Sequence, residues 1–164
     1  MQILDPCICS INTVFDQLLK EVKSLKIFSH QQASMMMLRA GIQITSVEGC
    51  SKKSGSSCTS LEAVRSNTLK CILILKKYCE CPIRIVGGTE INSLTSKQDI
   101  ISQINGYKLK IRLNSGFTNY IYTRCVRINE TTNGYKYKSK TSRNIYMQEV
   151  DLGYWDITFE STCI

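Results

Sequence analysis

Histidine is almost absent from this chain of 164 residues, which has one histidine, one tryptophan and two prolines. The single histidine, His30, excludes a metal site built from several histidines, and it leaves only one candidate base for a serine or cysteine nucleophile. No apolar run approaches the roughly 20 residues that a membrane-spanning helix needs. Acidic residues are also scarce, 13 against 21 basic ones, which gives a formal net charge of +8. Since apolar residues still make up 43% of the chain, near the globular average, we expect one ordinary domain with a core.

Cysteine is the residue in excess, with nine copies, a content typical of proteins from oxidising compartments. Against this, the first residues show no basic segment followed by an apolar stretch and a small-residue cleavage site, so no secretory signal is visible. Three explanations stay open: a mature form whose signal an added methionine replaces, a thiol-rich cytosolic protein, or a component of a particle that is oxidised after assembly. We expect an extracellular or virion location, with the cytoplasm as the alternative.

The spacing of the cysteines favours disulfides over zinc. The segments Cys7–Cys9 and Cys79–Cys81 each separate two cysteines by one residue, whereas structural zinc sites use pairs separated by two to four residues. We therefore predict no metal and no other cofactor. Cys50 and Cys58 bracket a polar loop rich in Ser, Gly and Lys, which a disulfide between them would close. With an odd total, at least one thiol stays free or pairs between chains.

Hydrophobic periodicity predicts three helices in the first half of the chain. Apolar residues at helical spacing indicate amphipathic helices over residues 11–27 and 31–40. The capping-box pattern of Thr59–Glu62 indicates a third helix that ends near residue 79.

Short β-type runs follow Pro82, and the dipeptide Asn133-Gly134 between two of them is a strong hairpin signal. Helices followed by such strands predict an α+β fold, with N-terminal helices packed on a mostly antiparallel sheet. Residues 1–29 are interpreted as an N-terminal extension with an amphipathic helix, and residues 30–164 as the main domain. The expected strands are Ile83–Val86, Tyr107–Leu113, Cys125–Asn129, Tyr135–Lys138, Asn144–Met147 and Trp155–Phe159, with a helix near 116–123.

Four segments together carry a family resemblance: Cys58–Arg65, Gly87–Glu90, Asn105–Ile111 and Tyr154–Phe159. Their sequences, CTSLEAVR, GGTE, NGYKLKI and YWDITF, resemble those of the zinc-dependent D-alanyl-D-alanine carboxypeptidases. That superfamily also contains the vancomycin-resistance dipeptidases and some phage endolysins, which cut peptidoglycan stem peptides. The resemblance covers nearly the whole chain and implies a D-Ala-D-Ala carboxypeptidase-like fold for the main domain.

The resemblance also implies where a metal would bind. In active members, zinc is held by the His and Asp of a Ser-His-x-x-Gly-x-x-x-Asp motif and by a second His just before the Trp of a C-terminal strand. On this sequence the motif starts at Ser102. Gln103 then stands at the first His, Lys110 at the Asp and Tyr154 at the second His. Asp151 stands where the base carboxylate would be, so the three ligands are replaced and the base position is retained.

These replacements predict a protein without catalytic residues, a pseudoenzyme of the zinc peptidase family. A protonated lysine repels a divalent cation by several kcal/mol at about 4 Å and a moderate effective dielectric. Neutral Gln and Tyr are poor zinc ligands. Two hypotheses describe Lys110: its ammonium replaces the charge of the metal and pairs with Asp151 or Asp156, or it points into solvent.

The resemblance extends to the disulfides. Secreted relatives with this pattern have one cysteine before the Gly-Gly-Thr-Glu strand and another after the helix that follows the Asp strand. This implies a bridge from Cys79 or Cys81 to Cys125, in addition to Cys50–Cys58. The cysteines outside this pattern, which would anchor the chain ends, are Cys7, Cys9, Cys71 and Cys163.

Taken together, these features predict a catalytically inactive, peptidase-like protein that is a structural component of an extracellular or virion assembly of the minor-capsid type. Its partners would be larger structural subunits or an anionic surface. The alternatives are a non-catalytic peptidoglycan- or glycan-binding module and, less favoured, an active cell-wall hydrolase. The segment Tyr135–Lys140 alternates aromatic and basic residues, which fits a solvated hairpin face better than a nucleic-acid site, so we expect neither nucleic acid nor membrane as a partner.

Overall fold

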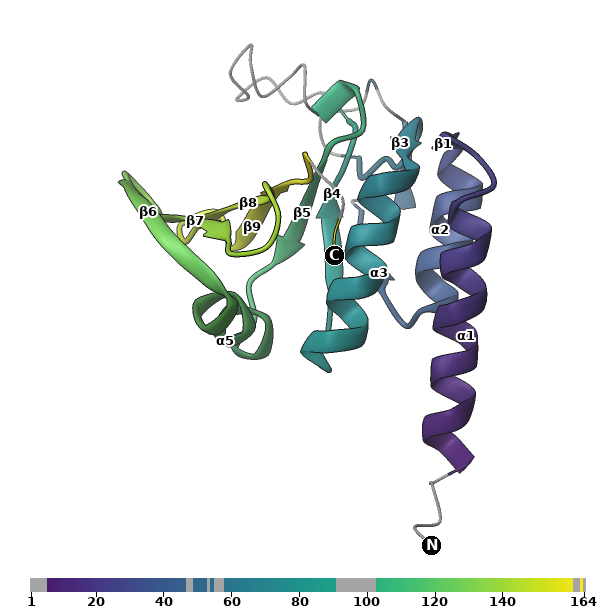
Figure 1. Cartoon of the computed structure of the whole chain (residues 1–164). Helices are drawn as coiled ribbons and strands as arrows, with labels where there is room; N and C mark the ends of the chain where they lie inside the picture. The colour runs from purple at the N-terminus through teal and green to yellow at the C-terminus, as the bar shows by residue number, and fades with distance from the viewer. Residues whose placement is uncertain are drawn as a thin grey trace, which may run out of the picture.

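A computed structural model describes residues 6–46, 49–52, 54, 58–90, 103–160 and 163, with side chains from residue 13 onward (Figure 1). Most of the helices lie in the first half of the chain, and the longer strands lie in the second. In chain order the elements are α1 (Pro6–Val22), β1 (Ile27–Phe28), α2 (His30–Arg39), β2 (Gln43–Ile44), β3 (Val64–Arg65), α3 (Ser66–Cys79), β4 (Arg84–Gly87), β5 (Lys108–Arg112), α5 (Ser115–Arg124), β6 (Cys125–Thr131), β7 (Gly134–Ser139), β8 (Ile145–Glu149) and β9 (Tyr154–Thr158).

Seven of these strands form one sheet in the order β2-β4-β5-β9-β8-β7-β6, and β1 pairs separately with β3. Within the described sheet only β2 and β4 run parallel, and the other neighbours are antiparallel. Figure 1 shows α1, α2 and α3 grouped beside the β4 end of the sheet, with β6 at the far edge. The predicted α+β class is confirmed, as is the hairpin: Thr132 and Asn133 form the turn that joins β6 to β7, and Gly134 is the first residue of β7.

The central strands separate an apolar face from a polar one, because successive side chains of a strand point to opposite sides. Leu109 and Ile111 of β5, like Trp155 and Ile157 of β9, have 0% exposure and belong to one core cluster with residues of α3 and α5. The register of β5 and β9 places a second set of side chains on the opposite side. This polar face carries Lys108, Lys110, Tyr154, Asp156 and Thr158.

Trp155 attaches β9 to α5. Its indole Nε1 donates a hydrogen bond of 3.1 Å to Oγ1 of Thr118. Its ring lies edge-on to those of Tyr137 and Tyr122, with centroid distances of 5.7 and 6.4 Å. A buried aromatic ring with a satisfied N–H is a strong anchor, so the orientation of β9 is fixed at this residue.

Helix α1 belongs to the same core as the rest of the chain. Phe15, Leu18 and Val22 are buried, lie in the shared core cluster and bring α1 against α3. The segment expected to be an extension therefore contributes directly to the packing of the fold. Among the helices that the structure describes, none is both long and apolar enough to cross a membrane.

The capping box predicted at Thr59–Glu62 is wrong, because α3 begins only at Ser66. Ala63 has a left-handed φ of 61°, which interrupts a helix, and the Glu62 carboxylate accepts the His30 N–H at 2.9 Å. A capping box is present instead at α2. There the Ser29 side chain accepts from the N–H of Gln32, whose side chain accepts from the N–H of Ser29.

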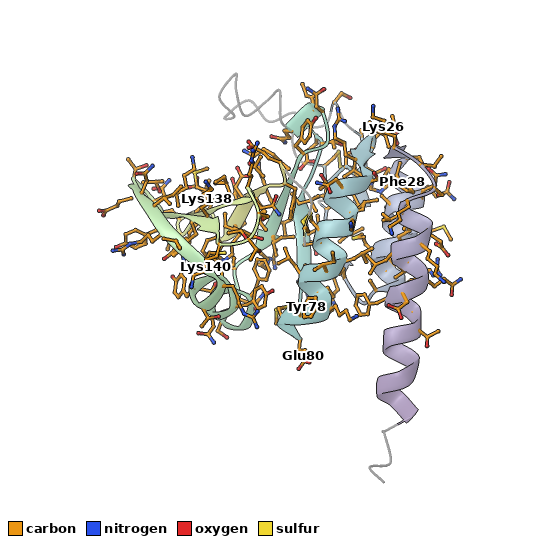
Figure 2. The ribbon with its side chains drawn as sticks, viewed as in Figure 1. Lys26, Phe28, Tyr78, Glu80, Lys138 and Lys140 are labelled. Carbon is orange, nitrogen blue, oxygen red and sulfur yellow. A yellow bond between two sulfur atoms is a disulfide. The ribbon has the colours of Figure 1, made fainter. Side chains whose placement is uncertain are left out.

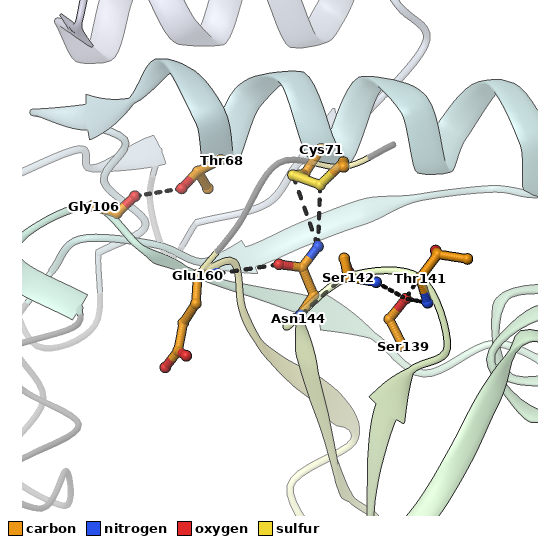
Figure 3. Close-up of a disulfide and its surroundings, with 9 residues drawn as sticks. Thr68, Cys71, Gly106, Ser139, Thr141, Ser142, Asn144 and Glu160 are labelled. Atoms are coloured by element: carbon orange, nitrogen blue, oxygen red, sulfur yellow. Dashed lines mark hydrogen bonds between the residues drawn. A yellow bond between two sulfur atoms is a disulfide. The ribbon is translucent and has the colours of Figure 1, made fainter.

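Three disulfides join described cysteines. The predicted Cys50–Cys58 bridge is present, and Cys71–Cys163 ties the C-terminal segment to α3. Figure 3 shows the second bridge beside Asn144, whose amide nitrogen lies 3.1 Å from the Cys163 sulfur. Three disulfides in a chain of this size are typical of an oxidising environment. Side chains at positions 7 and 9 lie outside the described residues.

The predicted bridge from Cys79 or Cys81 to Cys125 is wrong. Cys79 and Cys81 are bonded to each other, and Cys125 is a free, half-buried thiol at the start of β6. The cause is the residue between them, Glu80, which adopts a left-handed conformation at the end of α3 (φ 49°, ψ 35°). The resulting reversal of the chain brings the two Cα atoms to 5.1 Å, within the usual range for a disulfide.

The loop lengths predict unequal contributions of the disulfides to stability. Cys71–Cys163 spans 92 residues and Cys50–Cys58 spans 8. Loop-closure entropy grows with length, so the variant Cys71→Ser/Cys163→Ser should lose about 4 to 5 kcal/mol of unfolding free energy and Cys50→Ser/Cys58→Ser about 2 to 3. Urea unfolding of both double variants measures this. A larger loss of unfolding free energy in the Cys50→Ser/Cys58→Ser variant than in the Cys71→Ser/Cys163→Ser variant would contradict this prediction from loop length.

Candidate functional site

The polar face brings residues from β4, β5 and β9 side by side. Lys110 on β5 is the register partner of Gly87 on β4 and of Asp156 on β9. Tyr154, two positions before Asp156, begins β9. Gln103 lies just before β5 and is 2% exposed. The strands thus bring together two of the three positions that the resemblance marks as metal ligands, Lys110 and Tyr154, while Gln103 precedes β5 and contacts Glu90.

Glu90 is the residue that connects this group, and it is 4% exposed. The side-chain amide of Gln103 donates to its main-chain oxygen. Its carboxylate accepts from the N–H of Gly88 at 2.7 Å and from the N–H of Ser60 at 3.2 Å. Burial raises the pKa of Glu90, while these hydrogen bonds and the positive charge of Lys110 oppose the rise. The carboxylate is held by backbone donors rather than by solvent.

Lys110 lies near both Glu90 and the ring of Tyr154. A Cβ on Gly87 would come within 2.7 Å of Cδ of Lys110 and 2.9 Å of Oε1 of Glu90, so glycine at this position allows both side chains to pass over the strand. The Lys110 Nζ lies 5.2 Å from the centroid of the Tyr154 ring, a cation–π distance. We call Gln103, Glu90, Lys110 and Tyr154 the Lys110 cluster.

The expected pairing of Lys110 with Asp151 or Asp156 is not found among the described residues. The Asp156 carboxylate pairs instead with Lys108, at 3.1 Å between Nζ and Oδ2, with both side chains largely buried. Asp151, the expected base position, is exposed in the turn between β8 and β9. Lys108 and Lys110 point to the same side of β5. Because Lys110 lies beside Glu90 and Tyr154, Lys108 is the lysine that pairs with Asp156. Ser102, the first residue of the motif, lies outside the described residues.

The donor set of the Lys110 cluster does not fit a zinc ion. The Gln103 amide nitrogen already donates to Glu90, and an ammonium carries no free lone pair. Burial, together with the negative charges of Asp156 and Glu149, raises the pKa of Tyr154 to about 12, so its phenol is protonated at neutral pH. Within the described part of the chain, no group of three or more His, Cys, Asp or Glu side chains could hold a metal ion.

The only histidine has a structural role elsewhere. His30 Nδ1 accepts the N–H of Leu61 at 2.9 Å, and the main-chain N–H of His30 donates to the Glu62 carboxylate. Burial lowers the pKa of His30, which keeps the imidazole neutral and able to accept this hydrogen bond. His30 therefore joins α2 to the segment before β3.

Sequence patterns marked three of the four residues of the Lys110 cluster and missed Glu90. The signal for Glu90 is its place in the Gly-Gly-Thr-Glu segment, directly after a buried strand. No family model, curated protein or solved structure matches this chain. The likeness to the carboxypeptidase superfamily therefore rests on the four short sequence segments alone.

The geometry predicts that Lys110→Met destabilises the protein more at pH 8 than at pH 4. Methionine keeps the apolar stem but removes the ammonium, whose attraction for Glu90 exists only where that carboxylate is ionised. Because burial raises the pKa of Glu90 in the folded chain, this contribution is present at high pH and is lost as pH falls through the raised value. Urea unfolding should show a loss of about 1 to 2 kcal/mol at pH 8.

Lys136→Met is the matched control. Lys136 lies on the same side of the sheet, as the register partner of Met147, and Met147 is in turn the partner of Asp156. Removal of the Lys136 ammonium should give a small change in unfolding free energy that does not depend on pH. An equal loss for Lys110→Met at both pH values would contradict the contact with Glu90.

Proposed function

We propose that this chain is a catalytically inactive relative of the zinc D-alanyl-D-alanine carboxypeptidases that acts as a structural component of an extracellular or virion assembly. The observation that carries the proposal is the Lys110 ammonium, which lies over the Tyr154 ring and close enough to Glu90 to lower the pKa of that carboxyl. In active members of that superfamily, this is the place of an aspartate that holds the metal. Here the same position supplies a positive charge.

The electrostatic cost of placing a zinc ion beside Lys110 supports the proposal that this chain does not carry out zinc chemistry. A divalent cation at about 4 Å from an ammonium would be repelled by about 8 kcal/mol at an effective dielectric of about 20, twice the value for two unit charges. That energy is comparable to the whole stability of a small domain. A metal could bind only if the Lys110 side chain left the cluster.

The far edge of the sheet supports a role in assembly. Among the described strands β6 has one neighbour, and five consecutive residues on it are exposed, including Val126 and Ile128 at 50% and 41%. An exposed edge strand offers unpaired backbone groups to a strand of another chain. Lys138, Lys140 and Arg143 lie around the same hollow as these two apolar residues, with no carboxylate among its described lining residues. Acidic partner subunits would match this surface.

A glycan-binding module is the second candidate, and the Tyr154 ring favours it. The ring is half-buried on the polar face next to Lys110, so it presents an apolar surface beside a cation. Peptidoglycan fragments combine apolar and anionic groups that such a surface could contact. Binding to isolated cell-wall sacculi that Tyr154→Ala abolishes would favour this candidate over the assembly role.

The assembly role predicts that the chain co-purifies with a large particle at fixed stoichiometry from its native source. Ile128→Asp should reduce this association about tenfold or more, because it places a negative charge on the β6 edge beside basic residues and against an acidic partner. Val150→Asp is the control, since Val150 is also exposed, at 53% against 41% for Ile128, but lies outside β6. Sedimentation of the tagged full-length chain measures both. No association of the wild-type chain with any particle would overturn the role.

The family origin predicts that zinc binding can be restored. The triple variant Gln103→His/Lys110→Asp/Tyr154→His should bind one zinc per chain and gain thermal stability on zinc addition, while the wild-type chain should do neither. The double variant Gln103→His/Tyr154→His keeps the ammonium and should bind at least about 100-fold more weakly than the triple variant. Equal zinc affinity of the two variants would contradict the argument that the Lys110 ammonium prevents zinc binding.

A further inference from the structure

A cavity of about 640 Å³ lies between α3, α5 and the loop that joins β7 to β8. This volume is within the range of small-molecule sites. None of the residues of the Lys110 cluster lines it, so it is separate from the site described above. Its wall includes the Cys71–Cys163 disulfide and the 139–142 turn that Figure 3 shows around Asn144.

The wall of this cavity is largely apolar and aromatic, and it is open to solvent at Tyr78, which is 60% exposed. Ile74 and Leu75 line it from α3. Three tyrosine rings come from three different elements: Tyr78 from α3, Tyr120 from α5 and Tyr146 from β8. Burial raises the pKa of both Tyr120 and Tyr146, so these phenols stay neutral in the cavity at physiological pH. Such walls bind the apolar body of a ligand.

The charged groups of the cavity all have one sign. Lys70, Lys77, Arg124 and Lys140 line it, and no carboxylate is found among its described lining residues. The Arg124 guanidinium lies 5.4 Å from the Tyr120 ring centroid, and the Lys77 Nζ lies 5.8 Å from that of Tyr78, so two of the cations sit over the aromatic wall. In the described part of the chain, none of the four cations forms an ion pair.

We propose that this cavity binds an amphiphilic carboxylate, a molecule with an apolar body and one anionic head. The tyrosines and α3 side chains would enclose the body, and the cations would neutralise the head. A purely apolar ligand would leave four positive charges unused, and a polyanion would place its charges against the apolar wall. This inference does not depend on the proposed function.

Two lysines of one strand and its turn provide a matched pair for the test. Lys140 lines the cavity, whereas Lys138 lies two residues earlier and lines only the outer hollow at β6. Figure 2 shows both lysines on the hairpin, with Tyr78 across from them at the end of α3. The same change of charge can thus be made inside and outside the cavity.

Equilibrium dialysis of the full chain with micromolar dodecanoate tests the proposal. We expect one dodecanoate per chain, and at least about tenfold weaker binding of dodecylammonium and of dodecan-1-ol, which lack the negative charge. Lys140→Gln should weaken dodecanoate binding, Arg124→Gln/Lys140→Gln should weaken it about tenfold, and Lys138→Gln should leave it unchanged. Equal binding of the three amphiphiles, or equal effects of the changes at 138 and 140, would overturn the proposal.

Cys125 reports on the location of the bound molecule. Its free thiol lines the cavity, and burial raises its pKa to about 11. Dodecanoate should slow the reaction of Cys125 with methyl methanethiosulfonate, followed by mass spectrometry of the Cys125 peptide, at concentrations that match its binding. Binding without protection of this thiol would place the ligand elsewhere and would also overturn the proposal.

Discussion

The polar face of this protein depends on how one buried carboxylate, that of Glu90, is stabilised. A buried charge persists only when it is hydrogen-bonded and paired, and Glu90 has backbone N–H donors together with the nearby Lys110. Lys110 passes over the strand because Gly87 has no side chain. On the same strand, Lys108 pairs with Asp156. Two lysines of β5 therefore balance two acids within the chain, and this arrangement decides which ligands the face can hold.

The same strands connect this face to the core. Leu109 and Ile111 are buried among residues of the helices and the sheet, so the lysines that alternate with them cannot turn inward or slip by one position. Trp155, through its hydrogen bond to α5, likewise keeps Tyr154 and Asp156 on the polar face. A change of function could therefore proceed by side-chain replacement on one face, while the packing on the other preserved the scaffold.

Much of the fold follows from local sequence, and the exceptions have physical causes. Alternation of apolar residues locates β5 to within one residue of each expected end. The start of α3 does not follow from local sequence, since the tertiary contact of Glu62 with His30 outweighs a local capping pattern. The Cys79–Cys81 bridge depends on the backbone of Glu80, which no side-chain pattern reveals. In the site, the resemblance marks positions 103, 110 and 154, but it cannot say which of two lysines on one side of β5 reaches Asp156.

The account rests on the proposal that the Lys110 ammonium stands at the position where active members of the zinc carboxypeptidase superfamily hold a metal. The most direct measurement is an anomalous difference map at the zinc absorption edge, from crystals of the wild-type chain grown with zinc. The account predicts no zinc peak between Gln103, Lys110 and Tyr154, and electron density for the Lys110 side chain against the Tyr154 ring. A zinc ion at that place, with the Lys110 side chain turned away from Glu90, would contradict it.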